Sequence, residues 1–381
     1  MPEPLRFVPE VAVLGTGSVL GSRVVDNPTL ERLVSNYDPS SGDFSQWVER
    51  VTHIRTRHFC GPDESSGTMG AIAARRALEA AGADPESVDL VIVCGFTSKS
   101  LFPGDSVDIA RSINPRCGVY TIAAACAGSV YGLAMALGMV KSGLHRSVMV
   151  VGVEQLSKAT NFQDPLTAIL FADGAGAVLV GRPAVPVPDT GFVDRVVLRH
   201  EHAPGTIMME NANAAFEDRL VEATAHPGAD AVLRRQYLRM EGGPRVLRNA
   251  VNCMTETVVE ILGFRMEDLK AGHPALRELL EQVHVVPHQA NGRIVDGLQE
   301  KLGVPEERVY RTVYHAGNMS AATNPYTLDY AMREGNLRRR EHPDGRVEIG
   351  PCGRRLRKGD LVVVTTIGGG YLYGAVAFRL G

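Results

Sequence analysis

The feature that most constrains this chain is a series of short apolar runs, rich in β-branched residues, that recur along its whole length. Runs of this length and composition are typical of strands buried on both faces of a sheet. They lie at residues 11–18, 89–95, 147–154, 175–180, 283–288, 360–370 and 374–378. Residues 69–82 and 127–143 instead carry apolar residues at helical spacing, and each stretch ends in glycine, which predicts helices that stop at Gly82 and Gly143. Strands that alternate with helices predict a layered α/β fold.

The two halves of the sequence are alike. Residues 147–180 and 360–378 each contain two apolar strand-like runs. In both halves a predicted helix also leads into such a run, VDLVIVCG in the first and VHVVPHQAN in the second. We therefore predict two similar halves, 1–185 and 186–381, which divide near the proline-rich segment 181–191. Residues 200–240 and 338–358 are polar and charged, lie outside this repeat, and are predicted to be loops or surface insertions.

Composition and charge exclude several classes of protein. A net charge of −3 argues against a nucleic-acid partner, which would select a basic surface. We expect no membrane span, since apolar runs stay below the roughly 18 residues that a span requires, and the N-terminal MPEPLRFVPE does not resemble a signal peptide, which predicts a cytoplasmic protein. The six cysteines form no CxxC pair, so neither a zinc site nor any other metal or cofactor is expected.

Cys126 is the cysteine best placed for chemistry. It lies in TIAAACAGSVYG, where an apolar run meets the start of a predicted helix. The positive end of a helix dipole and the free N–H groups there favour thiolate over thiol, although a cysteine in an alanine-rich segment is more often structural. His288 follows a predicted buried strand, and Asn318 precedes a predicted helix in a Gly/Ser-rich loop; each alone is more often an ordinary polar residue.

Five ordered segments carry a family resemblance: AAACAG, FADGAGAVL, PHQANGRI, HAGNMSAATNP and IGGGYLYGA. In order and spacing they resemble the β-ketoacyl-acyl-carrier-protein synthase III family of the thiolase superfamily. The resemblance implies a thiolase fold, a five-layered αβαβα sandwich, with Cys126, His288 and Asn318 as the catalytic set. It also implies an oxyanion hole made by the backbone N–H groups of Cys126 and Gly369.

The implied reaction has two steps. Cys126 takes up an acyl group as a thioester, and a malonyl thioester then loses CO₂ and attacks that acyl group in a Claisen condensation, for fatty-acid initiation or a specialised polyketide pathway. Relatives that transfer acyl groups to oxygen or nitrogen tend to carry an acidic residue at position 318, so Asn318 favours condensation. Acyl transfer to oxygen or nitrogen, a thiolase-like reaction using Cys352, and a non-catalytic scaffold remain as alternatives.

The resemblance also implies contacts with an acyl carrier protein or coenzyme A. The matching positions are Trp47, Thr52, Arg248, Asn291, Arg293 and Lys301. Phe102 matches a residue that closes the acyl pocket of a partner subunit, which implies a homodimer. Two arginines that usually hold the nucleotide are replaced by Val51 and Pro165, and we therefore expect an acyl donor bound to a carrier protein, or a coenzyme A ester held differently.

Two glycine-rich segments suggest cofactor loops by their spelling. GTGSVLG, residues 15–21, has the spacing GxGxxxG, and no acidic residue follows at the distance that dinucleotide binding requires. The first three letters of FADGAGAVL match a cofactor abbreviation by coincidence and do not indicate a cofactor site. Both are predicted to be tight turns.

Overall fold

The first half of the chain builds a five-stranded sheet. The structure is a computed structural model that describes the chain except for residues 1–3, 101, 202–206, 210–236, 241–242 and 345. The sheet order is β2-β8-β7-β5-β6, and β5 pairs in parallel with both β7 and β6. Its strands are β2 (Ala12–Leu20), β5 (Leu90–Cys94), β6 (Gly118–Ile122), β7 (Ser147–Gln155) and β8 (Asp173–Gly181).

The second half builds a six-stranded sheet around the order β1-β9-β17-β16-β13, with β10 also paired to β17. Its strands are β1 (Phe7–Val8), β9 (Gly191–Val193), β10 (Val197–His200), β13 (His284–Pro287), β16 (Leu361–Gly368) and β17 (Leu372–Arg379). The short β1 comes from the N-terminal part of the chain and pairs with β9, so it crosses the division proposed at residue 185.

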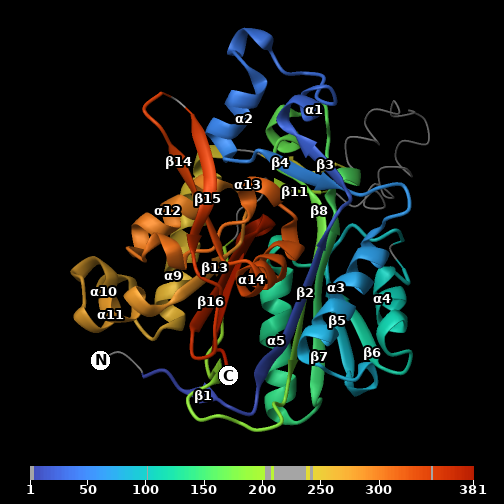
Figure 1. Ribbon diagram of the computed structural model, residues 1–381, viewed down its shortest axis with the longest axis vertical. Coiled ribbons are helices and arrows are strands. Elements are labelled where there is room, and N and C mark those ends of the chain that lie inside the picture. The colour runs from blue at the N-terminus through green and yellow to red at the C-terminus, as the bar shows by residue number, and fades with distance from the viewer. Residues whose placement is uncertain (1–3, 101, 202–206, 210–236, 241–242, 345) are drawn as a thin grey trace, which may run out of the picture.

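Helices separate and cover the two sheets, giving five layers (Figure 1). The central layer contains α5 (Gly128–Ser142) and α14 (Thr323–Arg333). The outer layers contain α3 (Ser66–Ala81) and α4 (Asp105–Ile113) on one side, and α9 (Gly243–Ile261) and α12 (Gly292–Leu302) on the other. On β7, Val148 and Val150 pack toward α5 whereas Met149 and Val151 pack toward α3, so the strand is apolar on both faces. This is the expected five-layered thiolase fold.

Smaller elements complete the fold. They are β3 (Arg23–Asp26), α1 (Asn27–Glu31), α2 (Phe44–Thr52), β4 (Thr56–Phe59), α6 (Pro165–Ala168), β11 (Ile207–Met208), β12 (Arg239–Met240), α10 (Met266–Ala271), α11 (Pro274–Gln282), α13 (Val313–Ala316), β14 (Asn336–Glu341) and β15 (Val347–Gly353).

The predicted helix ends are confirmed. Gly82 and Gly143 follow the last residues of α3 and α5 and have φ angles of 58° and 80°, the left-handed conformation that glycine adopts without a Cβ penalty.

The prediction that both glycine-rich segments are tight turns is wrong, because they are strands. Residues 15–20 lie in β2 and residues 173–179 in β8. A Cβ on Gly17 would lie 2.4 Å from the Ala73 carbonyl oxygen of α3, and one on Gly176 would lie 2.3 Å from the Tyr326 nitrogen of α14. The glycines therefore let two helices pack directly on the sheet.

The segment 338–358, predicted to be a loop or surface insertion, contains most of a β-hairpin. Strands β14 and β15 pair antiparallel and lie beside α2 (Figure 1). Leu337 and Ile349 pack against the same apolar cluster as Trp47, which explains why so charged a segment is ordered. Of the second predicted insertion, 200–240, residues 202–206 and 210–236 lie outside the described part of the chain.

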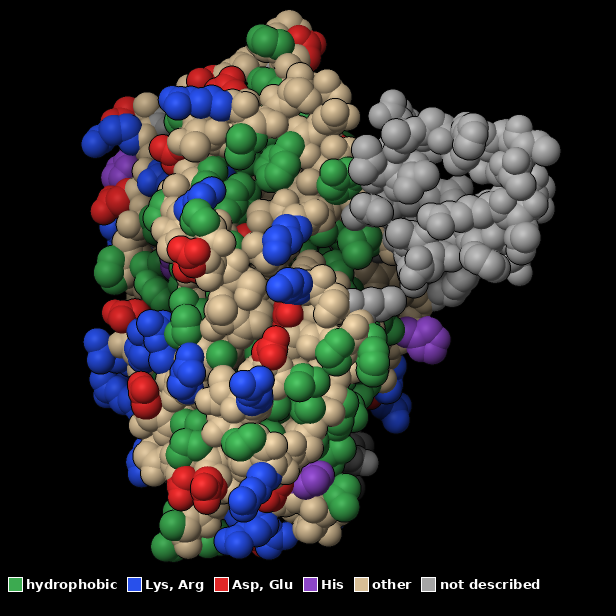
Figure 2. Space-filling model, turned by 90° about the vertical axis from the view of Figure 1, so that its right-hand side faces the viewer, with side chains coloured by type: hydrophobic (Ala, Val, Ile, Leu, Met, Phe, Trp, Pro, Cys, Tyr) green, Lys and Arg blue, Asp and Glu red, His purple; other side chains and the backbone are tan. Residues whose placement is uncertain are grey.

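The surface mixes both signs of charge. On the face shown in Figure 2, Lys and Arg side chains are interspersed with Asp and Glu side chains and with apolar patches. Among the described residues, no helix is both long and apolar enough to cross a membrane.

Candidate active site

Cys126 lies in a tight turn between an edge strand and a central helix. After β6 the chain forms a single 3₁₀ turn, η3 (Ala125–Ala127), and then enters α5. Ala125 has a φ of 45°, a conformation that costs free energy in a non-glycine residue and is concentrated at functional sites. The hydroxyl of Thr366 donates a 3.0 Å hydrogen bond to the Cys126 carbonyl and holds this turn against β16.

A second turn of the same kind leads into α14. In η7 (Ser320–Ala322), Ser320 has a φ of 47°. Two residues earlier, Asn318 accepts a 2.9 Å hydrogen bond from the Ser320 N–H through Oδ1 and donates a long 3.4 Å bond from Nδ2 to the Ala290 carbonyl. Because Oδ1 is occupied by a donor, the amide presents N–H groups, one of which remains for a substrate oxygen.

His288 follows β13, as predicted, and its side chain is fully buried. Its backbone N–H donates a 2.8 Å bond to the Thr365 carbonyl. Neither ring nitrogen has a hydrogen-bond partner among the described residues. Burial lowers the pKa of His288 to about 3, so the imidazole is neutral at ordinary pH and carries one N–H donor.

The structure brings these three side chains together around one narrow cavity of about 40 Å³. Gly368 and Gly369, at the turn between β16 and β17, line it too. A Cβ on Gly368 would lie 3.1 Å from the Cys126 nitrogen, so the glycine turn packs directly on the Cys126 backbone. The backbone N–H groups of Cys126 and Gly369 both stabilise the Cys126 thiolate, which places two donors at the sulfur.

The expectation that Cys126 favours the thiolate is wrong for the free protein. Only 7% of the residue is exposed, and burial raises the pKa of its thiol to about 11. The backbone N–H groups and the Ser320 hydroxyl act in the opposite direction but do not outweigh desolvation. In the free protein Cys126 is therefore a thiol, which would have to lose its proton before it could act as a nucleophile.

A second cavity, of about 230 Å³, meets Cys126 on another side. Its lining is apolar apart from Ser320 and the glycine turn, and includes Phe96, Ala123, Ala125, Leu156, Phe171, Met209 and Leu238. It exceeds the 150 Å³ or so of a cavity that holds benzene. Cys126 thus lies where an apolar chamber and a narrow polar-ended cavity meet.

The predicted carrier contacts divide into accessible and inaccessible residues. The prediction that Thr52 contacts the carrier is wrong. Thr52 is 1% exposed, and its hydroxyl donates to the Val48 carbonyl and accepts from the Ile54 N–H. Arg248, Arg293 and Lys301 are exposed on α9 and α12.

Two further predicted carrier contacts lie on α2 or are bonded to it. Trp47 is half-buried against Tyr37 and Phe44. Asn291 caps the N-terminus of α12 and donates a 3.0 Å bond to the Val51 carbonyl, joining α12 to α2. Val51 packs in the apolar cluster of α2, and Pro165 begins α6. Phe102 is 89% exposed in the single chain.

Cys352 lies on β15 and lines neither cavity at Cys126. Burial raises the pKa of its thiol to about 11. Because Cys126 has a similarly raised pKa, it is the position of Cys352, outside both cavities, that argues against a thiolase-like second cysteine.

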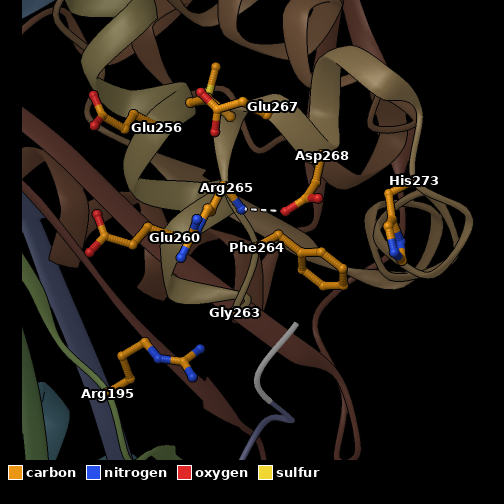
Figure 3. Close-up of a pocket in the computed structure, with 10 residues that line it drawn as sticks. Arg195, Glu256, Glu260, Gly263, Phe264, Arg265, Glu267, Asp268 and His273 are labelled. Atoms are coloured by element: carbon orange, nitrogen blue, oxygen red, sulfur yellow. Dashed lines mark hydrogen bonds between the residues drawn. The ribbon is translucent and has the colours of Figure 1, made fainter. Parts of the chain in front are cut away.

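A larger cavity, of about 710 Å³, lies away from Cys126 at the junction of α9 and α10 (Figure 3). Charged side chains surround it, including Glu256, Glu260 and Asp268, which accepts a 2.8 Å bond from the Arg265 N–H. None of the predicted catalytic residues Cys126, His288 and Asn318 lines this larger cavity.

Sequence reasoning missed Glu154 and Ser320. Both are buried beside Cys126. A glutamate at the end of an otherwise apolar strand, SVMVVGVEQ, was a signal available in the sequence.

Two family models match the segments that carry these residues. The model of 3-oxoacyl-[acyl-carrier-protein (ACP)] synthase III matches residues 120–192, and that of its C-terminal part matches residues 280–342. A β-ketoacyl-[acyl-carrier-protein] synthase III from Sphingopyxis alaskensis is 34% identical over 371 residues, covering 96% of this chain and 98% of that protein. The chain belongs to the ketosynthase III family.

Solved ketosynthase III structures share the fold. The priming β-ketosynthase of the R1128 polyketide biosynthetic pathway is 30% identical with a TM-score of 0.76, covering 100% of this chain and 98% of that chain. The 3-oxoacyl-[acyl-carrier-protein] synthase III of Aquifex aeolicus is 29% identical with a TM-score of 0.75, covering 97% and 99%.

Proposed function

We propose that this protein is a ketosynthase III-like acyltransferase that loads an acyl group on Cys126 and condenses it with a malonyl thioester. The observation that supports this best is the position of Cys126. It lies between an apolar chamber suited to an acyl chain and a narrow cavity lined by His288 and Asn318.

In the first step, the Cys126 sulfur attacks the carbonyl carbon of an acyl thioester. The bond from that carbon to the carrier sulfur breaks, and the proton lost by Cys126 ends on the released carrier thiol. Neutral His288 lines the same cavity. The N–H groups of Cys126 and Gly369 stabilise the tetrahedral oxyanion.

In the second step, a malonyl thioester loses CO₂ and its enolate oxygen accepts hydrogen bonds from His288 and Asn318. The enolate carbon then attacks the acyl group, a carbon–carbon bond forms, and Cys126 leaves and regains a proton. The low pKa of His288 serves this step, because a neutral imidazole donates a hydrogen bond over the whole ordinary pH range. Asn318 likewise donates without bringing a charge that would repel the enolate.

The carrier and the oligomer are part of the same proposal. Arg248 and Arg293 are exposed on α9 and α12, whose residues Val246 and Ile294 line the narrow cavity, and cations there suit an acidic acyl carrier protein. Val51 and Pro165 supply no charge for a nucleotide phosphate, which favours the carrier protein over coenzyme A. Exposed Phe102 is suited to burial against a partner subunit in a homodimer.

The experiment is intact-mass analysis after incubation with an acyl thioester, followed by malonyl carrier protein and measurement of CO₂. We expect acyl-Cys126, then CO₂ and a β-ketoacyl product. Cys126→Ala should lose both steps, and the matched Cys352→Ala variant should keep both. An acyl-enzyme that transfers its acyl group to an alcohol or amine without CO₂ release would refute condensation.

A further inference from the structure

Glu154 is a buried carboxyl group with one unsatisfied oxygen. It stands near the end of β7 and is 0% exposed. Its Oε2 accepts hydrogen bonds from the N–H groups of Phe96 and Thr97, at 3.3 and 3.2 Å, and from the Thr97 hydroxyl at 2.6 Å. Its Oε1 has no hydrogen-bond partner among the described residues. Buried carboxyl oxygens are seldom left in this state.

The Ser320 hydroxyl lies close to both this carboxyl and the Cys126 thiol. It is also buried, and it too has no well-formed hydrogen bond within the described part of the chain. It is nevertheless close enough to lower the pKa of both the Cys126 thiol and the Glu154 carboxyl. A hydroxyl has a single hydrogen to donate and rotates freely, so it can serve only one of the two groups at a time.

We propose that Glu154 and Ser320 are positioning residues behind Cys126, through which the carboxyl of Glu154 controls the charge state of the nucleophile. The proposal rests on the proposed role of Cys126. When Glu154 is protonated, it can donate to Ser320, whose hydroxyl is then directed to the Cys126 sulfur. When Glu154 is ionised, it takes the Ser320 hydrogen for itself and its negative charge opposes the thiolate.

Glu154 changes from its protonated to its ionised form in a pH range that experiments can reach. Burial raises the pKa of Glu154 to about 8, despite the donors at residues 96 and 97. The titratable groups coupled to it are two thiols, Cys126 on η3 and Cys94 on β5. In the parts of the chain that the structure describes, Glu154 forms no ion pair. A cation that would keep it ionised at neutral pH is therefore not in contact with it.

The test is the pH dependence of Cys126 alkylation by iodoacetamide, followed by peptide mass spectrometry from pH 6 to 10. This readout needs no acyl donor. In the wild type, we expect the alkylation rate to rise less steeply above about pH 8. In Glu154→Gln, which keeps the shape and removes the charge, we expect a steady rise, reaching about tenfold above wild type at pH 10 for a coupling of about one pKa unit.

Variants at two hydroxyl residues, Ser320 and Thr97, test the path from Glu154 through Ser320 to Cys126, which we call the relay. Ser320→Ala should slow alkylation below pH 8 by about tenfold or more, the usual loss for a hydrogen bond to a charged group. Thr97→Val removes a donor to the carboxylate and should move the change of slope to higher pH, whereas Thr97→Ser should restore the wild-type profile. Asp173→Asn is the matched control, because this buried carboxyl on β8 bonds Ser157 and Cys60 instead.

The outcomes separate the two proposals. A change of slope near pH 8 that survives in Glu154→Gln, or Ser320→Ala alkylated at the wild-type rate, would overturn the relay. A Glu154-dependent profile in a protein that accepts no acyl group would leave the relay standing and refute the proposed function.

Discussion

Gly368→Ala tests whether the glycine turn forms one wall of the oxyanion site. The backbone of Gly368 has φ −129° and ψ 175°, which alanine adopts without strain, so the effect of the new methyl comes from its contacts alone. Its Cβ would lie 3.1 Å from the Cys126 nitrogen and 3.0 Å from the Ala127 nitrogen. Contacts this short require the turn and the nucleophile to move apart by a few tenths of an ångström, as crowding in a packed core does.

That displacement should slow the reaction, because it lengthens the distance between the oxyanion and its N–H donors. Oxyanion donors work at about 2.7–3.1 Å, and removal of one donor lowers the rate about 10²- to 10³-fold, or roughly 3–4 kcal/mol. We therefore expect Cys126 acylation to slow by at least about tenfold and at most about 10³-fold. The free energy of unfolding should fall by only about 1–3 kcal/mol, as for an overpacked site.

The assay is single-turnover acylation followed by intact mass, with thermal unfolding measured alongside. Gly138→Ala is the matched control, since an added Cβ there meets nothing within 4 Å on an exposed helical face of α5. It should stabilise the protein by about 0.5–1 kcal/mol and leave acylation unchanged. Acylation of Gly368→Ala at the wild-type rate would refute the placement of the oxyanion site.

Three further outcomes follow from the site and its surroundings. Asn318→Asp should acylate normally but lose condensation by about 10²-fold or more, since a carboxylate repels the enolate; equal losses in CO₂ release and acylation would contradict this. Ala123→Phe should shorten the apolar chamber. If about two methylenes of a hexanoyl chain are excluded, at about 0.8 kcal/mol each, acylation by hexanoyl donors should fall about tenfold while acylation by acetyl donors is unaffected. An equal loss for both donors would argue against the chamber as the acyl site. Burial lowers the pKa of His284 and His315 to about 4 and that of His288 to about 3, below the unfolded value near 6.5. The unfolded state therefore binds more protons on these histidines between these values, so their contribution to stability is full above about pH 6.5 and is lost toward pH 4; a melting temperature that falls by the same amount toward pH 4 in His315→Gln would contradict this linkage.

The sequence by itself determined the fold class, because a strand buried on both faces and a helix with a glycine end each leave a local pattern. The apolar runs at 147–154 and 360–370 and the helix ends at Gly82 and Gly143 could be recognised without any long-range contact. The candidate residues Cys126, His288 and Asn318 were predicted from short motifs that resemble the family's, and such motifs can also be recognised without long-range contacts.

Only the tertiary structure decided what depends on neighbours distant in sequence. The glycines of β2 and β8 were misread as turns because the need for them comes from α3 and α14 packing on the sheet. The hairpin at 336–353 was not predicted as strands, because Leu337 and Ile349 find their apolar partners in a cluster built from distant parts of the sequence. The protonation of Cys126 was misjudged because the effect of a helix terminus is local, whereas desolvation and the nearby Glu154 come from parts of the chain distant in sequence.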